Sequence, residues 1–225
     1  MNRFRNLLII GTSHISGESL KNVEDSFTIF NPDIVAIELD RKRYLGLFQK
    51  RKKASAVEII KNVGLKGYLL LLIGGWVERK LGEKTGIMPG SEMRLAIRLA
   101  KKNNAVVALI DQDIEVTLRN FSAKFSWKEK WRMLSEIILS PFSGKKIEFD
   151  ISRVPERKII KKILEEVKEK YPNVYLVLIE ERNIVMANNL AGIMNNFPGK
   201  KVLAVVGAGH EDEIMSLVKK KIGES

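Results

Sequence analysis

Short apolar runs recur along the chain, separated by stretches in which apolar residues follow a helical spacing. None of the runs alternates cleanly between apolar and polar residues, and all are rich in Val, Ile and Leu. Strands with both faces buried have this pattern, which is typical of parallel sheets covered by helices. The runs lie at 6–10, 33–39, 105–110, 174–179 and 201–206. We therefore predict an α/β fold with a mostly parallel sheet of five core strands flanked by helices.

The stretches between these runs predict the helices. The segment 155–170, PERKIIKKILEEVKEK, has a Pro near its start and one apolar stripe, which indicates an amphipathic helix. Similar patterns predict helices over 16–30, 90–103, 183–195 and 211–221.

Two parts of the chain have helical spacing and no strand pattern. We predict one domain over 1–225, with helical insertions between strands at 41–83 and 120–149. The first contains the most apolar window, YLLLLIGGW at 68–76, which is shorter than the roughly 20 residues that cross a bilayer. This window predicts a buried helix, a contact surface such as that of a homodimer, or a segment lying on a membrane surface.

Charge and composition narrow the class of protein. The net charge is +12 and there is no Cys, so disulfides and Cys-based zinc sites are excluded and a cytoplasmic location fits. Basic runs at 41–53, 157–162 and 219–221 suggest either solvated helix faces or an anionic partner. They lack the interleaved aromatic residues of a stacking surface, so a nucleic-acid partner is not predicted. The N-terminus has no secretory cleavage site.

Both histidines of the chain close a Gly-x-x-His segment that follows an apolar run, GTSH at 11–14 and GAGH at 207–210. Ligands of open parallel sheets bind beyond the carboxyl ends of the strands. We therefore expect His14 and His210 to meet at one edge of the sheet. Charged residues end the other predicted strands, namely Glu38, Asp40, Asp111, Asp113, Glu180, Glu181 and Arg182.

This set of residues suits a metal site. Two neutral imidazoles and a carboxylate can hold a divalent ion with an open position for water. We predict His14, Glu38 and His210 as ligands at about 2.0–2.2 Å, with zinc, manganese or cobalt as the candidate ions. Gly11, Gly207 and Gly209 would let the backbone turn sharply towards a ligand, with Thr12 as a further binding residue.

Structural alternatives stand beside these roles. A His after a strand is often a cap or a loop residue. The buried Glu38 needs a partner, which is either an ion or one of Arg41, Arg43 and Arg182. Asp111 and Asp113 would equally cap the following turn. Glu180 and Glu181 would be surface carboxylates paired with Arg182.

Five blocks together resemble the TraB/PrgY family, named for a pheromone-shutdown protein and rich in archaeal members. The resemblance runs from Ile9 to Ile214 and includes GTSHISGES, NPDIVAIELDRKRY and VVGAGHEDEI. It also includes IMPGSEMRLAIRLAKKNNAVVALIDQDIEVTLRN and LIEERNIVMANNLAG. The family is grouped with Tiki-type and GumN-type proteins and, more distantly, with erythromycin esterase and ChaN-like haem-binding proteins.

The resemblance implies an α/β fold and a pocket built from the paired Gly-x-x-His segments and acidic residues. Tiki-type relatives are regarded as metal-dependent proteases, so the resemblance implies His14, Glu38 and His210 as ligands or catalytic groups, with Glu92 and Arg182 as further candidates. One departure is Gln112, where the family pattern has Arg. Many members continue beyond the GAGH block into hydrophobic, membrane-spanning segments. This chain ends at Ser225, and we expect a soluble member or the cytoplasmic part of a membrane-anchored protein.

The leading hypothesis is a metal-dependent hydrolase, peptidase-like, acting on a peptide or other small acyl substrate. Glu92 or Asp111 would be the general base and Arg182 would stabilise an oxyanion. The rival hypothesis is a non-catalytic protein that binds peptides or regulates signalling at a membrane surface, through 41–53 and 65–77. A third is an esterase that uses His as a base without a metal.

Overall fold

The computed structural model describes residues 2–13, 17–48, 55–85, 88, 90–139 and 157–223. Within these residues a five-stranded sheet has the order β1-β2-β5-β3-β4. The strands are β1 (Asn2–Phe4), β2 (Leu7–Thr12), β3 (Ile34–Ile37), β4 (Val106–Leu109) and β5 (Val202–Gly207). β1 pairs antiparallel with β2, and all other pairs are parallel. The predicted α/β fold with a mostly parallel sheet is confirmed.

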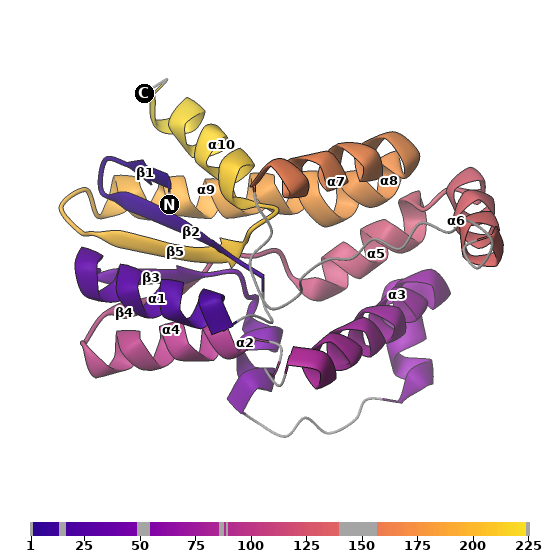
Figure 1. Ribbon diagram of the computed structural model, residues 1–225, viewed down its shortest axis with the longest axis horizontal. Coiled ribbons are helices and arrows are strands. Elements are labelled where there is room, and N and C mark those ends of the chain that lie inside the picture. Colours follow the sequence, from indigo (N-terminus) through magenta and orange to yellow (C-terminus); the bar gives the residue numbers. More distant parts are fainter. Residues whose placement is uncertain are drawn as a thin grey trace.

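Helices cover both faces of the sheet (Figure 1). Val23 and Phe27 of α1 (Gly17–Phe30) and Ile97 of α4 (Ser91–Lys102) pack on one face. Leu190 of α9 (Glu181–Asn196) and Val218 of α10 (Glu211–Gly223) pack on the other. The result is a sheet between two helical layers.

The β2 strand explains why the apolar runs do not alternate with polar residues. Leu7 and Ile9 belong to the core under α9 and α10, while Leu8 and Ile10 belong to the core under α1 and α4. Because successive side chains of a strand point to opposite faces, a strand with two covered faces needs apolar residues at every position.

One predicted strand is wrong. Residues 174–179 lie in the short helix α8 (Pro172–Tyr175) and the π-helical turn η2 (Leu176–Glu180), which leads directly into α9. A short apolar run does not by its spacing distinguish a buried strand from a buried helix. Pro172 at the first helical position was the local signal for a helix. The fifth strand of the sheet is β1, which forms a hairpin with β2 through Arg5 at positive φ.

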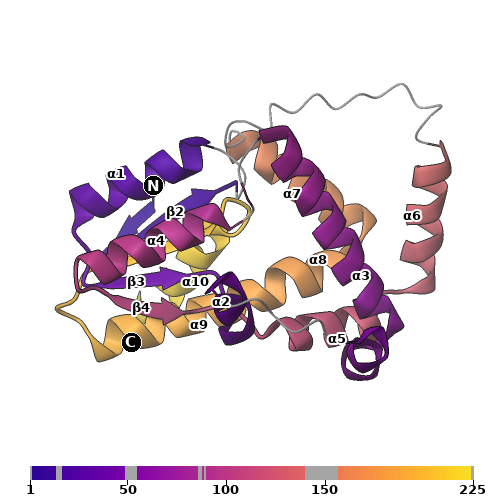
Figure 2. The ribbon, with the colours of Figure 1, turned by 90° about the horizontal axis from the view of Figure 1, so that it is seen from below.

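The remaining helices extend from one end of the sheet, on the right of Figure 1. Figure 2 shows α3 and α5 beside one another there, and they form the largest helix–helix contact of the described chain. These helices are α2 (Arg41–Phe48), α3 (Ala56–Thr85), α5 (Ile114–Lys124), α6 (Trp127–Leu139) and α7 (Arg157–Lys170). α2 lies within the first range predicted as helical, α3 begins within it and ends two residues beyond it at Thr85, and α6 lies within the second.

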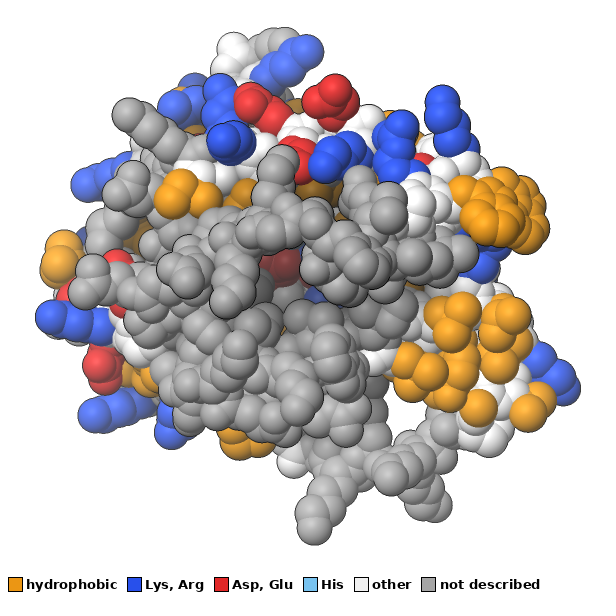
Figure 3. Space-filling view, turned by 45° about the vertical axis from the view of Figure 1, so that its right-hand side comes forward, with side chains coloured by type: hydrophobic (Ala, Val, Ile, Leu, Met, Phe, Trp, Pro, Cys, Tyr) orange, Lys and Arg blue, Asp and Glu red, His pale blue; other side chains and the backbone are white. Residues whose placement is uncertain are grey.

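The side of the molecule formed by α3 and α6 carries exposed apolar side chains. Leu65 and Leu69 of α3 and Trp127 and Trp131 of α6 are exposed. Figure 3 brings this side forward and shows hydrophobic side chains grouped at the right, with Lys and Arg spread over several sides. No helix in the described ranges is both long enough and apolar enough to span a bilayer.

Candidate functional site

The carboxyl ends of the parallel strands gather buried ionisable residues at one edge. In the sheet Thr12 lies opposite Gly207 and Ile37 opposite Val205, so β2, β5 and β3 end together. Glu38 follows β3 and is 6% exposed, Asp111 follows β4 and is 8% exposed, and His210 follows β5 and is 6% exposed. Charged groups at this depth require partners, and an arginine supplies them.

Arg182, in the first turn of α9, joins two of these residues. Its Nε and Nη2 donate to the two oxygens of Asp111 at 3.1 and 2.6 Å. Nη2 also donates to Oε1 of Glu38, and Nη1 donates to the carbonyl of Leu178 at 3.2 Å. The Asp111 contact is the bidentate geometry that a guanidinium and a carboxylate favour. One guanidinium therefore balances two carboxylates that follow different strands.

Glu38 is held from a second direction. Its Oε2 accepts a hydrogen bond of 2.5 Å from the backbone N–H of Gly207 at the end of β5. Among the arginine partners that the sequence offered for Glu38, the structure selects Arg182. The carboxylate is thereby fixed between β5 and α9.

Arg43 extends the cluster. Its Nε donates to Oδ2 of Asp40 at 2.6 Å, and its Nη2 pairs with Asp111. The other oxygen of Asp40 accepts the backbone N–H groups of Lys42 and Arg43 at 2.7 and 3.0 Å, which caps the start of α2. Cap and ion pair together fix Arg43 against the cluster.

The charges of the cluster shift its pKa values in consistent directions. Burial acts to lower the pKa of Arg182, but the negative charges of Glu38 and Asp111 outweigh it and raise that pKa. The pKa of Arg43 is raised in the same way, against burial, chiefly by Asp111. Burial acts to raise the pKa of Asp40, yet hydrogen bonds from Arg43 hold it below its ordinary value. Both arginines therefore stay charged.

His210 is oriented by a residue that the sequence analysis did not single out. Nδ1 of His210 lies 2.6 Å from Oδ1 of Asn183, and Nδ2 of Asn183 donates to Oε2 of Glu213 at 2.8 Å. The second bond fixes the amide, so its oxygen faces the ring and Nδ1 carries the proton. Asn183 is fully buried. Its one sequence signal is its place directly after Arg182, in the ERN triplet.

The other ring nitrogen faces the charged cluster. Nε2 of His210 lies 3.6 Å from Oε1 of Glu38 and 3.4 Å from Nη1 of Arg182. With the proton on Nδ1, Nε2 is the ring nitrogen that faces these two groups. The edge thus brings a base, a carboxylate and a guanidinium together.

The predicted binding residues take up structural positions at this edge. Oγ1 of Thr12 donates to the carbonyl of Val206 at 3.3 Å, which ties β2 to β5. A Cβ added to Gly11 would lie 2.6 Å from a carboxylate oxygen of Glu211, so glycine permits a close approach there. A Cβ added to Gly209 would instead meet Leu164 at 3.8 Å, an ordinary van der Waals contact. A binding role for these residues stays a prediction.

Glu92 is 1% exposed in the first turn of α4. α4 ends at Lys102, shortly before β4 begins at Val106, so the helix starts at the carboxyl edge of the sheet. Glu92 therefore lies at the same edge of the sheet as Glu38. Its role as a base stays a prediction.

The other charged residues at the predicted strand ends have structural partners. Asp113 caps α5 by accepting the N–H of Glu115 at 2.8 Å, as the capping alternative predicted. Glu180 pairs with Lys168 at 2.7 Å, and Glu181 pairs with Lys124. The ion pairs of Arg182 go to Glu38 and Asp111 instead. The amide of Gln112 donates to Oγ1 of Thr117 at 2.9 Å, which fastens the first turn of α5.

The predicted metal ligands can be tested in part. Among the described residues, no group of three or more His, Asp and Glu side chains is placed to hold an ion. His14 lies outside the described residues, so its distance from His210 stays a prediction. Glu38 and His210 fit an ion in type and spacing. Two ligands of a tetrahedral ion with bonds of ~2.1 Å stand roughly 3.4 Å apart, and their separation is 3.6 Å. Arg182 shares the same carboxylate oxygen.

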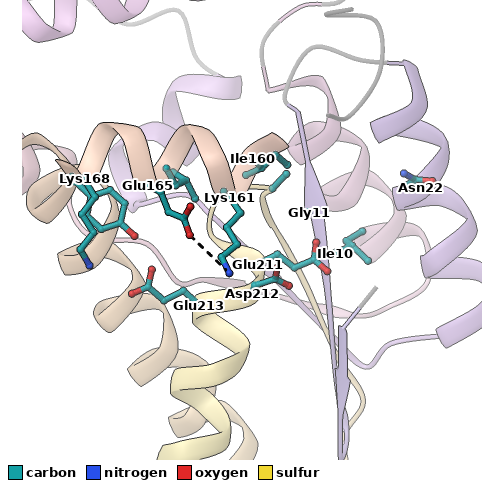
Figure 4. A pocket seen from close by; sticks show the side chains of 14 residues that line it. Ile10, Gly11, Asn22, Ile160, Lys161, Glu165, Lys168, Glu211, Asp212 and Glu213 are labelled. Carbon is teal, nitrogen blue, oxygen red and sulfur yellow. Dashed lines mark ion pairs between the residues drawn. The ribbon is translucent and has the colours of Figure 1, made fainter. Parts of the chain in front are cut away.

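A cavity of about 680 Å³ adjoins the edge. Gly209 and Glu211, the chain neighbours of His210, line it together with Gly11 at the end of β2. Figure 4 shows it between α7, the first turn of α10 and the strand ends.

Comparisons with known proteins show the family of the chain. The model of the TraB/PrgY/gumN family matches residues 3–221. An uncharacterized protein of Methanocaldococcus jannaschii is 33% identical over 219 residues, which cover 95% of this chain and 53% of that protein. A human TraB domain-containing protein is 23% identical over 191 residues, which cover 79% of this chain and 50% of the human protein. The chain thus spans about half the length of these curated relatives.

Proposed function

Because the chain belongs to the TraB/PrgY/gumN family, we propose that it hydrolyses an acyl bond, in peptides above all, at the cluster of Glu38, Arg182 and His210. One observation carries this proposal. Nε2 of His210 lies within 3.6 Å of Glu38 and 3.4 Å of Arg182, on a ring whose tautomer Asn183 sets. A buried base beside a fixed guanidinium is the pair of groups that acyl hydrolysis uses.

Each residue has a role that follows from its contacts. Nε2 of His210 accepts the proton of the attacking water, because Nδ1 is already protonated towards Asn183. Nη1 of Arg182 lies 3.4 Å from Nε2 of His210, and once Nε2 has taken the proton it no longer accepts from Nη1, so this N–H of the guanidinium is the donor that stabilises the oxyanion. The bidentate contact to Asp111 holds that guanidinium in place, so the geometry favours positioning over proton transfer as the role of Asp111.

In the metal-dependent form of the reaction, Nε2 of His210 would be a ligand instead of the base, and Glu38 and, as the sequence predicts, His14 would hold the divalent ion with it; Glu92 would then be the base, as the sequence predicts. Such an ion polarises a carbonyl and lowers the pKa of water. The 3.6 Å spacing and the tautomer that leaves Nε2 facing Glu38 support this assignment.

The test is cleavage of fluorogenic peptides by purified protein with zinc, manganese or cobalt added. We expect His210→Ala to lower the rate by about 10²–10⁴-fold, the usual contribution of a general base. Arg182→Lys keeps the charge but loses the bidentate geometry, so it should also be impaired. The matched control is Lys124→Ala, whose ammonium pairs with Glu181, the neighbour of Arg182, and which should retain full activity.

Three outcomes separate the hypotheses. Activity lost with EDTA and restored by one ion supports the metal-dependent reaction. Activity that survives EDTA but is lost in His210→Ala supports the metal-free esterase. A wild type that cleaves no peptide or ester under any of these conditions contradicts the proposal.

A second candidate is a non-catalytic protein that binds peptides or acts in signalling at a membrane surface. The exposed leucines of α3 and tryptophans of α6 favour it, because surface apolar groups mark interaction sites. If the wild type and His210→Ala bind a peptide with equal affinity, and the peptide is recovered intact from both, this candidate is favoured over hydrolysis. Light scattering of the same samples would test the predicted homodimer.

A further inference from the structure

The cavity beside His210 has a composition that the proposed reaction leaves unexplained. Figure 4 shows Lys161 and Glu165 of α7 on one side, and Glu211, Asp212 and Glu213 of α10 on the other. A volume of about 680 Å³ is in the range of small-molecule and peptide sites. It is large enough for an amino-acid side chain together with the backbone next to it.

Part of the cavity lining is apolar. Ile160 and Leu164 of α7, Tyr175 of α8 and Ile10 of β2 line the cavity. These side chains offer contact to an aliphatic stem. A ligand with only charged or polar atoms would leave them exposed to water.

The charge of the lining is opposite to that of the protein. Four acidic side chains and two lysines line the cavity, which leaves an excess of two negative charges in a chain of net charge +12. The lysines and Glu165 stand outward: the side chains of Lys161, Lys168 and Glu165 are 78%, 59% and 67% exposed, and Lys161 pairs with Glu165 at 3.9 Å, whereas Glu211 is 7% exposed. Exposed charges are screened by water, so the carboxylates of the buried Glu211 and the partly buried Glu213 dominate the field inside.

The pKa of Tyr175 is shifted by burial and by the same negative charge. Its pKa is raised, first by burial and then by the negative charge of Glu213. The hydrogen bond from Asn183 fixes the carboxylate of Glu213 in the lining of the cavity.

Helix capping accounts for only part of this charge. Acidic residues in the first turn of α10 stabilise the positive end of the helix. Glu165 stands in the third turn of α7, where that effect is absent, and still faces the same cavity. Two helices therefore contribute acids to one apolar cleft next to the reactive edge.

We propose that this cavity binds the cationic part of the substrate, a protonated amine or guanidinium on an aliphatic stem such as a lysine side chain. Its role as a specificity pocket rests on the proposed hydrolase function, while binding itself does not. The stem lies along Ile160 and Leu164, and the cation lies near Glu211 and Glu213.

Binding is tested with three blocked amino acids: N-acetyl-lysine methylamide, the neutral N-acetyl-norleucine methylamide and N-acetyl-glutamate methylamide. Affinities are measured by NMR titration of the wild-type backbone amides. We expect the lysine compound to bind about tenfold more tightly than the norleucine compound, with a preference that falls as salt is added. The shifted resonances should be those of α7 and of the first turn of α10.

Paired variants on α7 supply the control. Glu165→Gln removes a lining carboxylate and should weaken lysine binding about two- to fivefold, the range expected for a partly exposed ion pair. Glu166→Gln removes the next carboxylate, which pairs with Lys170 and does not line the cavity, and should leave the affinity unchanged. Glu211→Gln should weaken binding further, with its fold checked by circular dichroism.

Equal or tighter binding of the norleucine or glutamate compound, or shifts confined to other helices, would overturn the inference. So would the absence of binding by all three compounds. Lysine-selective binding at α7 and α10 in a protein that cleaves nothing would uphold this inference and reject the hydrolase proposal.

Discussion

Removal of the Arg182 side chain should destabilise the protein far more than removal of any surface cation. In Arg182→Met, the buried carboxylates of Glu38 and Asp111, whose side chains alone are 5% and 0% exposed, lose the guanidinium that balances them. Arg43 and the N–H of Gln112 still bind Asp111, and the N–H of Gly207 still binds Glu38. Breaking a buried ion pair from one side costs about 3–5 kcal/mol. We expect the lower half of that range because these hydrogen bonds remain.

The assay is urea unfolding followed by far-UV circular dichroism, which samples all of the helices. The control is Lys124→Met, which breaks the surface pair with Glu181 and should cost less than about 1 kcal/mol. The double variant Arg182→Met/Asp111→Asn removes both charges of the buried pair. It should cost about 1–3 kcal/mol less than the sum of the single variants, the usual coupling of residues in contact.

Two results would refute this reasoning. One is an Arg182→Met variant that loses no more stability than Lys124→Met. The other is a double variant whose loss equals the sum of the single losses, because independent sites add and coupled sites do not.

Three further predictions concern stability. Gly11→Ala should lower the free energy of unfolding by about 1–3 kcal/mol in thermal melts, because the added Cβ would meet Glu211 at 2.6 Å and the backbone of Ala208 at 2.8 Å. The control is Gly209→Ala, whose added Cβ would have no neighbour nearer than 3.8 Å and which should melt like the wild type. At the start of α6, the hydroxyl of Ser126 accepts the N–H of Glu129 at 3.2 Å, and the carboxylate of Glu129 accepts the N–H of Ser126 at 3.0 Å. Ser126→Ala removes this cap and should lower the free energy of unfolding by about 1 kcal/mol in urea titration. Because the pKa of Asp40 is lowered in the folded state, its carboxylate adds stability that is present above about pH 4 and lost as the pH falls below it. In Asp40→Asn, the free energy of unfolding should therefore fall less steeply with falling pH than in the wild type. Equal slopes of the two proteins would contradict the prediction.

The sequence predicted most of the sheet because burial on two faces leaves a local signature. The runs at 6–10, 33–39, 105–110 and 201–206 are rich in apolar residues, and each became a strand; β2, β3 and β5 are buried, whereas β4 is a partly exposed edge strand. The run at 174–179 has the same character and became a helix. Local composition reports that a segment is buried, but in a short run it does not report which backbone geometry buries it.

The candidate site divides in the same way. Glu38, Asp111 and His210 were identified because each follows a buried strand, and the structure brings them to one edge. The partners of these residues could not be identified. Arg182 was expected at the end of a strand and stands instead in the first turn of α9, and Asn183 gave almost no signal.

The sequence by itself determined the α/β class, the positions of most helices and the family, through apolar periodicity and the two Gly-x-x-His segments. Only the tertiary structure decided which charges meet. The strand order β2-β5-β3-β4 sets β5 between β2 and β3, and so brings Gly207 to Glu38 from 169 residues away. Arg182 reaches Glu38 from 144 residues away. Such pairings depend on how strands and helices stack, and the energy that selects the stacking is spread over the whole core rather than held in a local segment.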